Sequence, residues 1–131
     1  MQFKSAPVLI EGCILPPDSA GLFYADKTKF RACSSADLPA DKVAFMADSH
    51  PPTTARALST PLTQAAWKTK PSWGIVPTAD KSLNPVIQRA LYKRSGTKVI
   101  EIEGASHFVY ISQPSAVANV IEAAAKNSLR N

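Results

Sequence analysis

The amino-acid sequence predicts an α/β fold, in which a β-α-β-α unit with two parallel strands follows a region of short helices. Two observations support this fold class. After Trp67, short apolar runs alternate with longer segments whose apolar residues recur at helical spacing. Before Trp67, frequent prolines divide the chain into short pieces that leave little room for extended strands. We therefore expect two regions, residues 1–66 and residues 67–131.

The first region is expected to consist of short helices joined by loops. Its clearest helix is predicted from about Pro39 to Ser49, with Asp37 or Leu38 near its start, because proline suits the first turn of a helix. Three apolar residues should form the buried face of this helix: Val43, Met46 and Ala47.

The second region begins with an apolar strand predicted at Ser72–Pro77. A helix should follow at Pro85–Arg94, because Asn84 can cap its start and Gly96 can end it. Its buried stripe is expected to contain four residues: Val86, Ile87, Ala90 and Leu91.

A second strand is predicted at Thr97–Ile102 and a second helix at Pro114–Lys126. The apolar residues of this helix are spaced to pack one face onto a sheet: Val117, Val120, Ile121 and Ala124. Two strands joined through a helix should be parallel, with a right-handed crossover. Since parallel sheets normally contain more than two strands, we expect the missing strands on another chain or on an upstream segment.

Composition argues against several classes of partner. The net charge is +5, from 15 Lys+Arg against 10 Asp+Glu, but the basic residues are scattered and not interleaved with stacking aromatics, so no nucleic-acid partner is expected. No apolar run approaches the roughly 18 residues that cross a bilayer, so no membrane partner is expected either.

Cysteine usage leads to an expectation about the cellular compartment. Cys13 and Cys33 are too few for a disulfide-stapled scaffold, and their spacing matches no zinc motif. We therefore expect reduced, buried thiols and a cytoplasmic protein. No cluster has metal-ligand spacing and no glycine-rich phosphate loop occurs, so no metal and no cofactor are expected.

An acid and a histidine follow the two predicted strands. Asp80 lies on the segment that leaves the first strand, and His107 on the segment that leaves the second. Functional residues of open parallel sheets gather at the carboxyl ends of the strands, and neighbouring strands lie about 4.8 Å apart. Asp80 and His107 can therefore form the orienting acid and the general base of one site. Each could instead have a local role, Asp80 capping the turn before Asn84 and His107 lying on an exposed loop.

Four segments around this pair carry a family resemblance: Lys70-Pro71-Ser72-Trp73, Thr78-Ala79-Asp80-Lys81-Ser82-Leu83-Asn84-Pro85, Gly104-Ala105-Ser106-His107 and Ser112-Gln113-Pro114. Through them the sequence resembles the C-terminal part of an α/β-hydrolase, over roughly residues 20–126. Before Trp67, Asp37-Leu38-Pro39 and Phe45-Met46-Ala47 resemble the helical cap of some small bacterial members. This resemblance implies that residues 1–66 form a cap, that Asp80 is the triad acid and that His107 is the triad histidine.

The nucleophile of that family is absent from the sequence. No Gly-x-Ser-x-Gly occurs, and the nearest approach, Pro17-Asp18-Ser19-Ala20-Gly21, lacks the first glycine and a preceding buried strand. The oxyanion hole is missing with it. Ser106 and Ser82 are poor substitutes, because each is too close in sequence to His107 or Asp80 and is better suited to shaping its loop. His50 is expected to be structural.

The sequence therefore predicts an esterase-like α/β-hydrolase fragment that carries the triad acid and histidine and is inactive alone, so whether this chain is itself an enzyme stays open. Its substrate would be a small ester, bound once an N-terminal half is supplied. Five apolar residues are candidates to line the acyl or alcohol pocket, or else to form ordinary packing: Leu22, Phe23, Phe45, Met46 and Trp67. The alternative is a small non-catalytic module that pairs with another chain or with itself through its exposed sheet edge.

Overall fold

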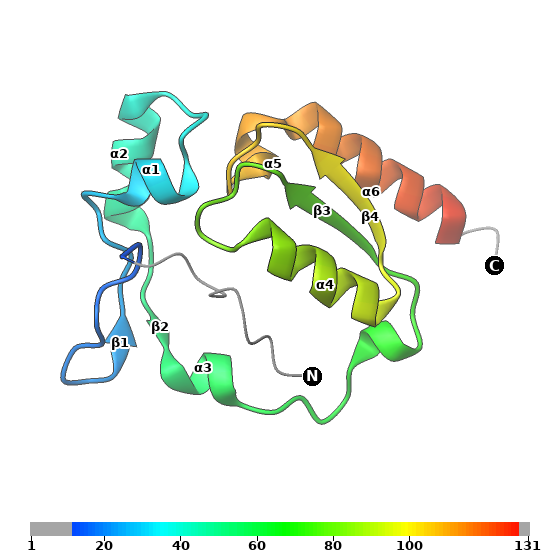
Figure 1. Ribbon diagram of the computed structural model, residues 1–131, viewed down its shortest axis with the longest axis horizontal. Coiled ribbons are helices and arrows are strands. Elements are labelled where there is room, and N and C mark those ends of the chain that lie inside the picture. The colour runs from blue at the N-terminus through cyan, green and yellow to red at the C-terminus, as the bar shows by residue number, and fades with distance from the viewer. Residues whose placement is uncertain (1–11, 129–131) are drawn as a thin grey trace.

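The computed structural model describes residues 12–128, so residues 1–11 of the predicted first region and residues 129–131 of the second lie outside it. Figure 1 shows two lobes side by side. The N-terminal lobe, residues 12–59, contains β1 (Leu22–Phe23), α1 (Phe30–Ser34), α2 (Ala40–Ser49), β2 (Thr53–Thr54) and α3 (Ala55–Ser59). The sheet lobe, residues 72–128, contains β3 (Trp73–Pro77), α4 (Pro85–Ser95), β4 (Lys98–Ile102), α5 (Val109–Ser112) and α6 (Pro114–Ser128). A short 3-10 helix, Ala66–Lys68, lies between the lobes in sequence.

The core of the N-terminal lobe lies between α1 and α2. Phe30, Leu38, Val43 and Ala47 are buried together, and Met46 packs partly buried against them. The predicted face of this helix is therefore confirmed. Phe108 and Ile111 of the sheet lobe pack against the same cluster, so the two lobes share part of their apolar interior.

The N-terminal lobe also contains a small antiparallel ladder that the sequence did not predict. Leu22 pairs with Thr54 and Phe23 with Thr53. A strand of two residues has no room to display the alternation of apolar and polar residues by which strands are recognised. The second strand runs directly into α3 at Ala55, so the ladder is a brief interruption in a region of short helices.

The expectation of reduced cysteines is wrong. Cys13 and Cys33 form a disulfide, with their Cα atoms 6.0 Å apart, and no free cysteine remains in the described chain. The turn before β1 folds the chain back on itself, since the Asp26 N–H donates to the Cys13 carbonyl at 3.0 Å. This contact brings Cys13 next to α1, a proximity that a separation of 20 residues in sequence does not reveal. The cytoplasmic expectation therefore loses its premise.

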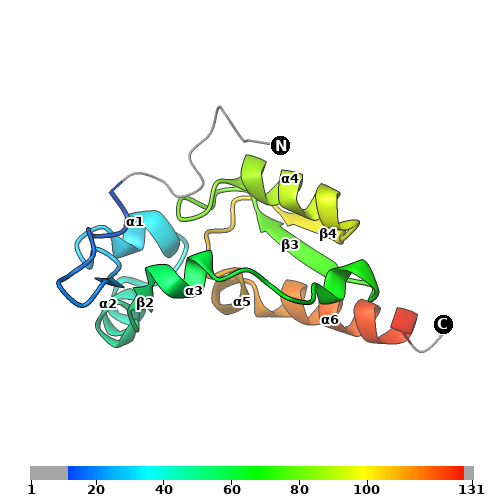
Figure 2. The ribbon, with the colours of Figure 1, turned by 90° about the horizontal axis from the view of Figure 1, so that it is seen from below.

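The sheet lobe has the predicted β-α-β-α order, with one short helix that was not predicted, α5, inserted before the last helix. β3 and β4 are parallel, in a register that runs from Trp73 opposite Lys98 to Pro77 opposite Ile102. Within residues 12–128 this sheet contains these two strands and no others. Figure 2 shows α4 on one face of the sheet and α6 on the other.

Local signals fix the ends of α4. The Asn84 carboxamide oxygen accepts the Val86 N–H at 2.9 Å, and Pro85 occupies the first turn. Gly96 closes the helix with φ of 67°, a left-handed backbone conformation that residues other than glycine rarely adopt. The predicted start and end of this helix are confirmed.

The predicted apolar stripes are only partly buried. Ile87 and Val120 face the interior, but Val86 is 60% exposed and Ile121 is 64% exposed. A sheet two strands wide is too narrow to cover the whole apolar face of a helix on either side. The inner face of α4 also buries Gln88, a polar residue that the apolar pattern did not include.

Gly74 on β3 should tolerate no side chain without loss of stability. A Cβ atom at this position would lie 2.7 Å from Cζ of Tyr92, well inside contact distance, so the ring of Tyr92 would have to move. We expect Gly74→Ala to lower the free energy of unfolding by about 1–3 kcal/mol, measured by urea denaturation. In a Tyr92→Leu background the same substitution should cost markedly less. An equal cost in both backgrounds would contradict the steric explanation.

Candidate active site

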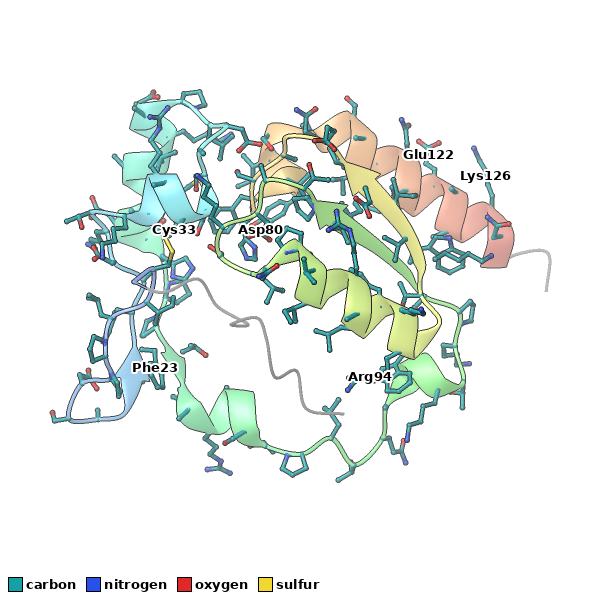
Figure 3. All side chains as sticks on the ribbon, in the orientation of Figure 1. Phe23, Cys33, Asp80, Arg94, Glu122 and Lys126 are labelled. Carbon is teal, nitrogen blue, oxygen red and sulfur yellow. A yellow bond between two sulfur atoms is a disulfide. The ribbon has the colours of Figure 1, made fainter. Side chains whose placement is uncertain are left out.

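Asp80 lies on the loop between β3 and α4, and every oxygen of its carboxylate has a partner. Oδ1 accepts the backbone N–H groups of Ser82 and Leu83 at 2.8 and 2.9 Å, and Oδ2 accepts the side-chain amide of Gln88 at 2.8 Å. The residue is only 3% exposed. A buried carboxylate with this many donors is fixed in position and stays ionised. Figure 3 shows Asp80 on this loop.

His107 follows β4 and meets Asp80 at the same edge of the sheet. Its Nδ1 lies 2.8 Å from Oδ2 of Asp80. An ionised carboxylate only accepts hydrogen bonds, so Nδ1 must carry the proton, and in the neutral ring Nε2 is then the basic nitrogen. The His107 side chain is 39% exposed, and Nε2 makes no hydrogen bond within residues 12–128. Nε2 is therefore available to a reacting group.

The two roles considered for Asp80, capping the turn and pairing with His107, coexist on different oxygens. The turn-capping role is carried out by Oδ1, which accepts from Ser82 and Leu83. The pairing with His107 uses Oδ2. From the sequence these roles were alternatives, but a carboxylate has two oxygens and about four lone-pair directions, which are enough for both.

The pKa of Asp80 lies below its usual value of 3.8. Burial is the largest single effect and raises this pKa, but the hydrogen bond and charge of His107 and the N–H groups of Leu83 and Ser82 together outweigh it. The pKa of Asp37 is also lowered. Partial burial raises this pKa, but the hydrogen bonds from Ser106 outweigh that effect. Both carboxylates are thus stabilised in their charged form by folding.

Stability should therefore fall in acid. A carboxyl group whose pKa is lower in the folded than in the unfolded chain stabilises the fold fully above the unfolded value, here about 3.8, and loses this contribution as the pH falls through the folded value. We expect the free energy of unfolding, measured by urea denaturation, to decrease between pH 5 and pH 2. The double variant Asp37→Asn/Asp80→Asn should show a shallower decrease than the parent chain. Equal slopes would contradict this assignment.

An apolar cavity of about 290 Å³ lies beside His107. Its lining comes from both lobes: Cys13, Ile14, Ala25, Phe30, Cys33, Ser34, His50, Ser82, Leu83, His107 and Phe108. The five residues predicted as pocket lining are absent from this wall, and Phe45 and Trp67 are exposed. The sequence did not reveal which side chains of the first region face His107.

The other candidate side chains have structural roles, although the cysteines take theirs as a disulfide and not as the expected free thiols. The Ser106 hydroxyl donates to Asp37 and the Ser82 hydroxyl contacts Ser34 Oγ at 2.5 Å, so neither is aimed at His107. The His50 ring packs edge-on against Phe30 with centroids 5.4 Å apart. Cys13 and Cys33 are committed to their disulfide.

Three residues around the pair were missed by sequence reasoning. Gln88 orients Asp80 from one turn inside α4, Asp37 holds the residue before His107, and Ser34 contacts Ser82. A polar residue on the inner face of a helix, as Gln88 is, was the one signal available. For Asp37 and Ser34 the partners are about 50 to 70 residues away in sequence, and no local pattern predicts such contacts.

The described residues show neither a metal centre nor a membrane span. Between residues 12 and 128, no three or more His, Cys, Asp and Glu side chains come together as metal ligands would. Of the helices in that range, none combines the length and the apolar character needed to cross a bilayer.

Parallel strands flanked by helices, with an acid and a histidine paired beyond their carboxyl ends, define an α/β protein of the hydrolase type. The chain matches the Alpha/beta hydrolase family over residues 4–120. It therefore belongs to the α/β-hydrolase family. No curated protein and no solved structure matches it significantly.

Proposed function

We propose that this chain provides the acid and base of an esterase-like catalytic triad, and that a separate nucleophile-bearing half completes the site. The observation that carries the proposal is the 2.8 Å contact between Asp80 Oδ2 and His107 Nδ1, in a histidine that lines an apolar cavity and whose Nε2 has no hydrogen-bond partner within residues 12–128. We call the complex with the nucleophile-bearing half the assembled enzyme.

In the assembled enzyme, Nε2 of His107 takes the proton of the attacking serine and later gives it to the leaving alcohol. Asp80 holds the ring in the tautomer that leaves Nε2 basic, and its charge stabilises the imidazolium that forms. The apolar wall of the cavity favours a substrate with an apolar acyl or alcohol group. No metal or cofactor is needed for this chemistry.

The chain alone should be inactive, because its sequence contains no Gly-x-Ser-x-Gly from which a nucleophile and half of an oxyanion hole could come. Residues 12–66 would then serve as the cap over the site. The disulfide favours an oxidising compartment over the cytoplasm, since cytosolic thiols are kept reduced. Nucleic acids and membranes are not among the proposed partners.

The test begins with the coding DNA upstream of Met1. We expect a reading frame that encodes an apolar strand followed by Gly-x-Ser-x-Gly. Co-expression of that segment with this chain should produce hydrolysis of a nitrophenyl ester, and His107→Ala should abolish it. The proposal fails if no such frame exists, if the assembled protein is inactive, or if the isolated chain hydrolyses the ester in a His107-dependent manner.

A second candidate is a non-catalytic module that associates through its sheet edge. The observation in its favour is that β3 has one strand neighbour within residues 12–128, so its other edge has unpaired backbone groups there. Sedimentation analysis over a range of concentrations separates the two candidates. A stable dimer that forms no complex with the upstream segment would favour the module.

A further inference from the structure

The loop that contains His107 is held on both sides by one short segment of the N-terminal lobe, residues 34–37. We call this segment the clamp. The Phe108 N–H donates to the carbonyl of Ser34 at 3.2 Å, on the C-terminal side of His107. On its N-terminal side, the Ser106 N–H donates to Asp37 Oδ2 at 3.0 Å, and the Ser106 hydroxyl donates to Oδ1 of the same carboxylate.

The clamp also contacts the loop of the acid. Ser34 Oγ lies 2.5 Å from Ser82 Oγ, and the Ser82 N–H is one of the donors to Asp80. The Ser82 hydroxyl also donates to the carbonyl of Cys33, the residue before the clamp, at 3.3 Å. One stretch of chain thus contacts both loops that follow the strands, and the relative position of Asp80 and His107 depends on it.

Asp37 is the charged member of the clamp, and its chemistry suits the task. A carboxylate has two acceptor oxygens and no donor, so it can accept the N–H and the O–H of Ser106 at once. Hydrogen bonds to an ionised acceptor are stronger than neutral ones, and Ser106 is only 2% exposed. Together these bonds fix the backbone and the side chain of the residue that immediately precedes His107.

Other contacts hold the residues on either side of Ser106 and His107. The Ala79 N–H donates to the Ala105 carbonyl at 3.0 Å, and the Phe108 ring stacks on Phe30 with centroids 5.7 Å apart. Ser106 is tied by neither contact, so without Asp37 the chain could pivot between Ala105 and Phe108. Such a pivot would move the His107 ring away from Asp80.

We propose that Asp37 is a positioning residue, which holds Ser106 so that Nδ1 of His107 stays hydrogen-bonded to Asp80. This inference rests on the proposed function, in which that pair is the acid and base of the triad. Asp37 touches neither the substrate nor the reacting atoms and acts through the His107 loop. Since Asp37 is itself exposed, replacing it creates no buried cavity.

The test reads the tautomer of His107 directly, in the full chain with its disulfide intact. The chain contains two histidines, so ¹⁵N-labelled imidazole gives few signals, and His107→Gln assigns them. In the parent chain we expect His107 to be protonated at Nδ1 only. Asp37→Ala should replace this signature with an average of both tautomers, and Asp37→Asn should have a smaller effect because one acceptor oxygen remains. Asp37→Glu should restore the parent signature in part.

Asp41→Asn is the matched control, since it removes the same charge from an exposed position in the first turn of α2. Its spectrum should equal that of the parent chain. Ser106→Ala provides an independent arm, because it removes the hydroxyl bond and keeps the N–H bond. This variant should show partial averaging even if Asp37→Ala does not fold. In the assembled enzyme, Asp37→Ala should lower kcat by about 10–100-fold with little change in KM.

The outcomes separate this inference from the proposed function. If Asp80→Asn changes the His107 signature but Asp37→Ala and Ser106→Ala leave it intact, Asp37 is not a positioning residue and the acid and base pair still stands. If Asp80→Asn also leaves the signature intact, the pairing itself is wrong.

Discussion

Asp80→Asn should lower kcat of the assembled enzyme about 10⁴-fold, with KM nearly unchanged. The substituted amide would present its NH₂ group either to His107 or to the N–H donors of Ser82 and Leu83. At the Oδ1 position the NH₂ group would face two backbone donors, whereas at the Oδ2 position it would face only one fixed donor, the Gln88 amide, because His107 can change tautomer. The favourable solution places an N–H opposite Nδ1, which forces the proton of His107 onto Nε2 and leaves no base for the nucleophile.

Two measurements support the interpretation of that loss. Asp41→Asn should retain full activity, because Asp41 lies in the first turn of α2 and outside the pair. The free energy of unfolding of Asp80→Asn, measured by urea denaturation, should show that the protein remains folded under the assay conditions. An active, folded Asp80→Asn enzyme would remove Asp80 from the triad.

Elements with strong local signals were predictable from the sequence. The helix α4 begins with a cap and a proline and ends at a left-handed glycine, β3 is an apolar run of ordinary length, and β4 is a short strand in which three of five residues are apolar. The meeting of Asp80 and His107 followed from topology, since residues that leave adjacent parallel strands share one edge. Here a general rule about sheets replaced the missing information about long-range contacts.

Contacts between residues far apart in sequence, within the N-terminal lobe and between the lobes, were not predictable. The disulfide and the bonds of Asp37 and Ser34 join residues 20 to 69 positions apart, and their geometry depends on how short helices pack. The burial of the apolar helix faces was overestimated for a different reason. Val86 and Ile121 match the helical period, but a helix buries only what its neighbours cover, and the described sheet is narrow.

Removal of the disulfide should destabilise the chain by about 3 kcal/mol, a fall in melting temperature of roughly 10 °C. The bond closes a loop of 20 residues that contains β1, so the reduced unfolded chain gains the conformational freedom that the bond had excluded. Cys13 Sγ also lies 3.6 Å from the carbonyl oxygen of Lys81, directly after Asp80. Loosening Cys13 therefore also removes packing from the acid loop.

Thermal unfolding with and without a reductant measures this effect. Since these are the only two cysteines of the sequence, a reductant changes no other bond. The double variant Cys13→Ser/Cys33→Ser should melt near the temperature of the reduced parent and should not respond to the reductant. A parent chain whose melting temperature is the same in both conditions would mean that the bond adds nothing to stability. The clamp would then rest on its hydrogen bonds and on the packing of Phe30 and Phe108 alone.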